Sequence, residues 1–195
     1  GKLKYLEPAQ PLRQGFLYNN LMYAASGQII YLIEGKTWEE YLQEKILNPL
    51  QMKHTVFSID AMQKHTDYFV GYNEKRDTNI LLEAEYMNET DGLGPAGSIV
   101  SNISDLSHWL SALMNKGMYE GKQVIPEATI NATLAPSIAL TNGLLEQGYT
   151  EMLNPVYGMG RQTCVYRGHQ LALHGGDLRG IHSQISYMPQ DNIGV

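Results

Sequence analysis

The sequence predicts an α+β fold, with a mainly helical region over residues 1–156 and antiparallel strands over residues 157–195. In the first region, apolar residues recur at helical spacing in several segments. From Tyr157 onward, short segments alternate between polar and apolar residues and are separated by glycines. A run of helices followed by the beginning of a sheet is typical of α+β proteins.

The first two helices are expected over residues 20–34 and after Thr37. The segment 20–34 is apolar on most sides, so we expect a buried helix. Gly27 within it costs about 1 kcal/mol relative to alanine, which predicts close packing against another backbone. Thr37 and Glu40 form a capping box for the second helix, which Pro49 ends.

Two further helices follow, separated by connections. Pro126 opens a short helix that ends before Pro136. Residues 60–95 and 137–156 lack clear periodicity, and we expect them to be long surface connections that line a cleft. The other of these two helices precedes the Pro126 helix in the chain and ends before Gly117. Its apolar stripe contains Ile103, Leu106, Trp109, Leu110, Leu113 and Met114.

The last part of the chain predicts consecutive antiparallel strands joined by glycine turns. If the turn in GGDLRG centres on Leu178, His174 faces His182 directly across a hairpin. The three expected strands lie in the segments YGMGRQTCVY, HQLALHG and GIHSQISYM.

Composition excludes some classes of function. The chain has 195 residues and a formal net charge of −6, without a block of like charges. This argues against a nucleic-acid partner, which needs a basic patch, and against a polybasic membrane anchor. No window has the eighteen apolar residues of a transmembrane segment. The single cysteine, Cys164, is expected to be a small apolar residue of a strand.

Tyr18 and Asn20 are the first candidate site residues, because they lie two apart where the first helix is expected to begin. On one interpretation, an asparagine caps the helix and Tyr18 packs beside it. On the other, the hydroxyl and the amide both point into a cleft. These residues alone leave both interpretations open.

His174, Gly175 and Gly176 form the second candidate. A histidine at the end of a strand is commonly a hydrogen-bonded structural residue, and glycines there serve a turn. The alternative is the wall of a catalytic site, where bare backbone approaches a substrate.

The order of the motifs distinguishes these alternatives. Tyr18-x-Asn20 is followed by PLQMKHT (49–55), PAGSIVSNISDLSHWL (95–110), YGMG (157–160) and His174-Gly175-Gly176. Together they resemble the serine hydrolases typified by class C β-lactamases, which include D-alanyl-D-alanine carboxypeptidases, esterases and aminopeptidases. The resemblance extends from residue 16 to residue 195 and implies a β-lactamase/transpeptidase-like fold.

The sequence departs from this family in one respect. The resemblance implies a Ser-x-x-Lys motif ahead of Tyr18, in which serine is the nucleophile and lysine helps to activate it. No serine of this chain has a lysine three residues later. We therefore expect a fragment, with the nucleophile encoded upstream of Gly1 and the sheet incomplete.

The resemblance also implies roles for the candidate residues. Tyr18 would relay a proton, with a nearby cation lowering the tyrosine pKa from about 10. Asn20 would bond the substrate amide or the catalytic lysine. The N–H of Asp177 would complete an oxyanion hole, while Gly175 and Gly176 keep the wall bare.

His174 stands where the family usually has lysine. Because histidine is mostly neutral at pH 7, we expect weaker selection for carboxylate-bearing β-lactams and more tolerance of esters. The expected partner is a small-molecule or peptidoglycan-like substrate. No cofactor is expected. The resemblance to this family favours a bacterial periplasmic or extracellular location. The sequence does not indicate an oligomeric state.

Two rival interpretations are also open. His174, His182 and Asp177 could converge on a metal ion, with His169 nearby. However, His169 and His174 lie five residues apart on a strand and face opposite sides, so we expect no metal site. The second rival is a pseudoenzyme or a peptidoglycan-binding module of the same fold.

Overall fold

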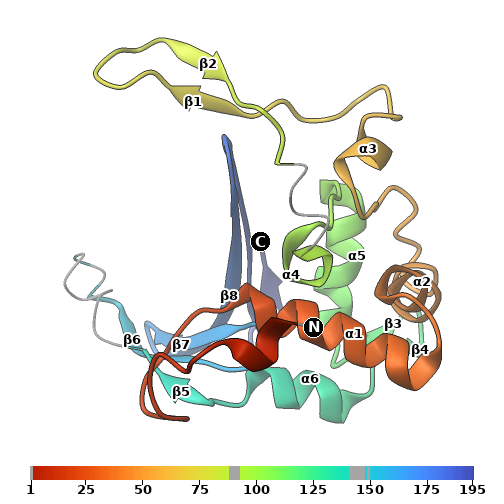
Figure 1. Cartoon of the computed structure of the whole chain (residues 1–195). Coiled ribbons are helices and arrows are strands. Elements are labelled where there is room, and N and C mark those ends of the chain that lie inside the picture. The colour runs from red at the N-terminus through yellow and green to blue at the C-terminus, as the bar shows by residue number, and fades with distance from the viewer. Residues whose placement is uncertain (1, 88–92, 141–147, 149) are drawn as a thin grey trace.

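The computed structural model describes residues 2–87, 93–140, 148 and 150–195, and it confirms the α+β class (Figure 1). One antiparallel sheet has the strand order β10-β9-β8-β7-β6-β5, so strands consecutive in the chain are neighbours in space. Its strands are β5 (Ile138–Ala139), β6 (Met152–Tyr157), β7 (Gln162–Tyr166), β8 (His169–Leu178), β9 (Ile181–Met188) and β10 (Ile193–Gly194).

The helices lie beside this sheet (Figure 1); the four predicted ones are present, and three further short helices among the described residues were not predicted. The capping box of Thr37 and Glu40 is present. Gly117, which was predicted to follow the helix with the apolar stripe, has a φ of 85°. No helix among the described residues is long and apolar enough to cross a membrane. The helices are η1 (Lys2–Tyr5), α1 (Asn20–Glu34), α2 (Trp38–Leu42), the π-helix η2 (Gln43–Leu47), α3 (Ile59–Met62), α4 (Gly94–Gly97), α5 (Ile103–Met114) and α6 (Glu127–Leu134).

Helix α1 is where the expectation of burial was wrong. Only Gly27 is buried, where a Cβ would lie 2.4 Å from Cγ of Pro95, in α4. The close approach was therefore predicted correctly, although the neighbour is a side chain. Met22 and Leu32 are 53% and 74% exposed. The helix is apolar on most sides, but α2 and α4 cover only one of them.

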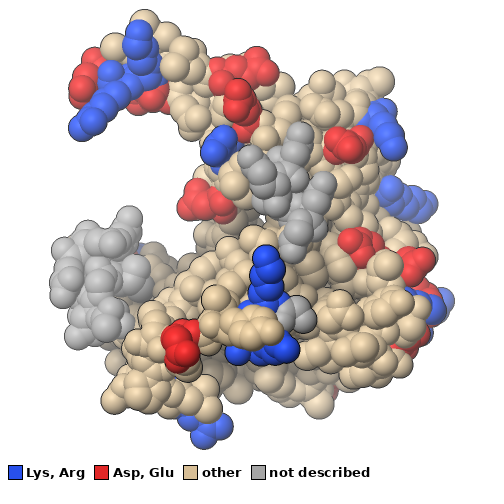
Figure 2. Space-filling view, viewed as in Figure 1, with Lys and Arg blue, Asp and Glu red and all other residues tan. Residues whose placement is uncertain are grey.

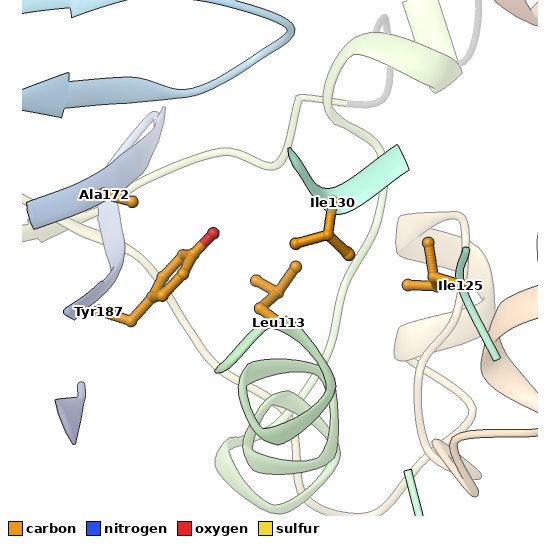
Figure 3. Close-up of a cluster of buried hydrophobic side chains, with 5 residues drawn as sticks. All are labelled: Leu113, Ile125, Ile130, Ala172 and Tyr187. Carbon is orange, nitrogen blue, oxygen red and sulfur yellow. The ribbon is translucent and has the colours of Figure 1, made fainter. Parts of the chain in front are cut away.

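The core lies between the sheet and helices α5 and α6. Leu113 of α5 and Ile130 of α6 meet Ala172 and Tyr187 of the sheet, and Ile125 completes this cluster (Figure 3). A second cluster lies on the other side of α5 and contains Leu47, Leu50, Met52 and Ala112. Trp109 packs against both clusters, so α5 connects the helical layer to the sheet.

A buried carboxylate fixes the start of α5. Asp105 is 2% exposed, and its Oδ2 accepts hydrogen bonds of 2.8 Å from the His54 N–H and from the Thr55 hydroxyl. The Asp105 N–H donates to Oδ1 of Asn102, which caps the helix. A loop that precedes α5 by some fifty residues is thereby held at its first turn.

The expected connections contain short strands that the sequence did not reveal. β1 (Tyr72–Glu74) and β2 (Leu81–Glu83) form a hairpin that projects from the molecule, and Figure 2 shows charges of both signs at its tip. Residues 137–156 supply β5 and most of β6, so the sheet begins before Tyr157. β1, β2 and β5 have two or three residues, too few for alternation to be visible, whereas β6 has six and its register shifts between Leu153 and Val156. β3 (Met118–Tyr119) and β4 (Lys122–Gln123) form another small hairpin.

The predicted register of the β8–β9 hairpin was wrong. His174 pairs with Ile185, and Asp177, rather than His174, pairs with His182. The turn consists of residues 179–180 because Gly180 takes the left-handed conformation, with a φ of 69°, which suits glycine. The centre of the hairpin is therefore later than Leu178, and His174 lies farther from the turn than expected.

We predict that Asp105→Ala lowers the free energy of unfolding by about 2–4 kcal/mol, because it removes the buried acceptor of the His54 N–H and leaves the Thr55 hydroxyl with Ser101 as its one remaining partner. Urea unfolding of the full-length protein, followed by tryptophan fluorescence, measures this change. Asp67→Ala is the control, because Asp67 is exposed. Equal effects of the two substitutions would contradict a role for Asp105 in holding the loop.

Candidate active site

Tyr18 lies just ahead of α1, in the extended segment that leads into the helix. Asn19, rather than Asn20, caps this helix: its side chain accepts a hydrogen bond from the Met22 N–H. The Tyr18 ring is 56% exposed, and its centroid lies 6.3 Å from that of His174. The structure thus brings together two candidates that are more than 150 residues apart in the sequence.

The His174 imidazole is hydrogen bonded through both of its nitrogens. Its Nε2 lies 2.8 Å from the Tyr157 hydroxyl, and its Nδ1 lies 2.6 Å from the carbonyl oxygen of Gly175. Phe16 packs on the Tyr157 ring with centroids 4.9 Å apart, and Tyr18 meets that ring edge-on at 6.4 Å. Four rings therefore form one cluster at the end of β6.

The strand β8 has an open backbone edge beside this cluster. Ser186 and Val195 exchange two hydrogen bonds of 2.8 Å, so the backbone groups of Ser186 point toward β10. Leu173 is the partner of Ser186 on β8, so the backbone N–H and C=O groups of Leu173 must point the other way, toward β7. The register is continuous, so Gly175 and Asp177 point the same way. β7 pairs with β8 only as far as Leu173, and no described strand pairs with β8 beyond it on that side.

Side chains of β9 lie over the two glycines of this wall. A Cβ at Gly176 would lie 2.7 Å from Oγ of Ser183, and one at Gly175 would lie 3.0 Å from Oε1 of Gln184. The wall is therefore less bare than expected, and at Gly175 the backbone oxygen of Ser183, 3.3 Å away, also limits the space. The Asp177 carboxylate is exposed and lies 3.1 Å from Nδ1 of His182.

The structure gives Asn20 no comparable contact. It is exposed on the first turn of α1, and its side chain forms no hydrogen bond with any described residue. No group of three or more His, Cys, Asp or Glu side chains is placed to hold a metal ion among the residues with described positions. The proposed meeting of His174 with His182 fails because of the register. A surface hollow of about 340 Å³ near Ile130 contains none of the candidate residues.

Comparison with known families identifies the family of the chain. The family model described as Beta-lactamase matches residues 1–195. The chain belongs to the beta-lactamase family. This is a family of serine hydrolases, so the fold and the order of motifs that the sequence predicted are both accounted for.

The chain matches part of a longer curated relative. The unguisins hydrolase ungD of Aspergillus violaceofuscus is 28% identical over 201 residues, a match that covers 99% of this chain and 35% of that protein. The chain therefore spans about a third of the length of that curated relative.

Solved structures show the same fold. The octameric penicillin-binding protein homologue from Pyrococcus abyssi superposes with a TM-score of 0.77 at 24% identity, covering 96% of this chain and 39% of that one. A D-stereospecific amidohydrolase from Streptomyces sp. superposes with a TM-score of 0.72 at 18% identity, covering 94% of this chain and 50% of that one.

Sequence reasoning missed two members of the cluster of four rings. Tyr157 was assigned only to a strand motif, and Phe16 only marked where the resemblance begins. Neither carried a signal of its own, since Tyr157 meets His174 only because β6 and β8 lie on either side of a shorter strand.

We predict that Tyr157 keeps its proton at a pH at which exposed tyrosines lose theirs. Burial raises the pKa of Tyr157, and the nearby Tyr23 and Tyr18 add to the rise. A raised pKa means that the neutral phenol persists at a pH above the ordinary tyrosine pKa of about 10. In ¹³C-tyrosine NMR of the full-length protein, the Tyr157 Cζ signal, assigned with Tyr157→Phe, should keep its neutral shift after the exposed tyrosines have ionised. Ionisation together with them would contradict this prediction.

Proposed function

We propose that the chain supplies one side of a serine hydrolase site that transfers the acyl group of an ester, a β-lactam or a D-amino-acid peptide to water. The observation that carries the proposal is the meeting of Tyr18 and His174 beside the open edge of β8. In this proposal, the Tyr18 hydroxyl and the unpaired backbone donors of β8 serve the same small ligand.

The proposed reaction has two steps. A serine hydroxyl, from a Ser-x-x-Lys motif elsewhere in the full-length protein, attacks the substrate carbonyl carbon. The bond to the leaving group breaks, and the proton lost by the serine passes through Tyr18 to that group. Water then attacks the acyl-enzyme, and the carboxylic acid product and the free serine are formed.

Asp177 would act through its backbone rather than its carboxylate. Its N–H points to the open edge, where it can donate a hydrogen bond to the oxyanion that forms at the substrate carbonyl. A donor fixed in a strand needs no reorganisation when the charge develops, and one such donor commonly accelerates the reaction about 10²–10³-fold. Asn20 is exposed at the start of α1, and it would orient a substrate amide or the catalytic lysine.

A fluorophosphonate probe, which reacts with activated serines, tests this proposal. We expect the full-length protein to be labelled on one serine, and peptide mass spectrometry should place that serine outside residues 1–195 with a lysine three residues later. A labelled serine inside residues 1–195 would overturn the assignment of the nucleophile. Absence of any label would overturn the hydrolase proposal in favour of a binding module of the same fold.

We predict that Tyr18→Phe lowers kcat/KM for a short-chain nitrophenyl ester about 10²–10⁴-fold, because the relay hydroxyl is lost. Tyr31→Phe is the matched control, since Tyr31 is a tyrosine of α1 with a similar exposure, 53% against 56%. Steady-state kinetics of both full-length variants measure the effect. A loss below threefold for Tyr18→Phe would remove Tyr18 from the relay.

A further inference from the structure

The Tyr157–His174 contact has a direction, which follows from hydrogen-bond chemistry. A carbonyl oxygen only accepts, so the 2.6 Å contact between His174 Nδ1 and the Gly175 oxygen requires the proton on Nδ1. In a neutral imidazole the other nitrogen is then an acceptor. The Tyr157 hydroxyl at 2.8 Å must therefore donate to Nε2.

We propose that Tyr157 is a positioning residue that holds His174 as the Nδ1–H tautomer and so directs its N–H onto the Gly175 carbonyl at the open edge of β8. The catalytic consequence rests on the proposed function, whereas the tautomer is a property of the resting protein. With both nitrogens engaged, His174 presents no N–H to a substrate carboxylate. The site therefore suits substrates that lack a carboxylate at this wall.

The surroundings of Tyr157 are built to keep its hydroxyl in place. The chain turns at Gly158, where a Cβ would lie 2.5 Å from the carbonyl oxygen of Ala135, so the turn is pressed against the end of α6. Phe16 covers one part of the ring and Tyr18 meets another part edge-on. Burial also keeps the hydroxyl protonated, as a donor must be.

The contact also connects the ring to the strand that would bind the substrate. The carbonyl of Gly175 is one of the groups on the open edge, and the His174 N–H occupies it. With that carbonyl satisfied internally, the backbone donors remain for the substrate. Loss of the Tyr157 hydroxyl would free the ring to adopt the other tautomer and would release the Gly175 carbonyl.

Histidine ¹⁵N NMR of the full-length protein tests the tautomer without any substrate. At a pH at which the ring is neutral, we expect the Nδ1–H tautomer for His174, with the signal assigned by His174→Gln. In Tyr157→Phe, the second tautomer should become populated, so the Nδ1 and Nε2 signals of His174 should move toward each other. Tyr119→Phe is the matched control, because Tyr119 lies beside another histidine, His108, with ring centroids 5.4 Å apart.

An Nε2–H tautomer in the wild type, or unchanged His174 signals in Tyr157→Phe, would overturn the proposal. In kinetics with a nitrophenyl ester, we expect Tyr157→Phe to lower kcat about tenfold with KM changed less than twofold, because the edge is misplaced rather than missing. The wild type should also prefer the ester to a chromogenic cephalosporin, which bears a carboxylate. Faster cephalosporin turnover would overturn the inferred selectivity.

The two proposals fail in different ways. If the wild type reacts with neither the fluorophosphonate probe nor the ester, the hydrolase proposal fails, and the ¹⁵N spectra still decide the role of Tyr157. If the enzyme is active but the spectra of Tyr157→Phe match the wild type, only the positioning role fails.

Discussion

The candidate site depends on the unequal lengths of two neighbouring strands. β8 has ten residues and β7 has five, so one side of β8 is paired only as far as Leu173. Backbone N–H and C=O groups are obligatory hydrogen-bonding groups, and those beyond Leu173 need partners other than a strand. Side chains supply one such partner, at Gly175, and a ligand can supply others. The unequal strand lengths thus leave backbone groups of β8 open beside Tyr18 and His174.

Helix α5 gives this edge a fixed position in the molecule. Leu113 packs against the sheet, Ala112 packs against the helical cluster, and Trp109 contacts both. The buried Asp105 ties the first turn of α5 to the loop at His54. The layers are therefore held together by one helix with two apolar sides, and a change in its start would reach the sheet through side-chain packing.

Local features of the fold could be predicted from the sequence, because neighbouring residues determine them. The capping box of Thr37 and Glu40, the stripe on α5 and the alternation of β7 to β9 are of this kind. The exposure of α1 and the register of the β8–β9 hairpin were not predicted correctly. The first depends on which elements cover the helix, and the second on the conformation of a single residue, Gly180.

The prediction of the candidate site came from a resemblance between motifs and not from local patterns, and it named some of the residues that lie together. Tyr18 and His174 were paired through a resemblance between motifs, and the structure places their rings near one another. The partner of His174 could not be found in this way. Tyr157 contacts it across the end of a strand, and such a contact depends on strand lengths that alternation alone leaves uncertain by several residues.

The burial of Cys164 has a consequence for the chemistry of the chain. It is the single cysteine of the sequence, it lies in β7, and it is 4% exposed. Burial raises the pKa of its thiol, so the reactive thiolate is disfavoured in the folded state. Oxidants and alkylating reagents can then reach the sulfur only when the residues that cover it move away. The rate at which this thiol is modified therefore reports how often this part of the sheet is uncovered.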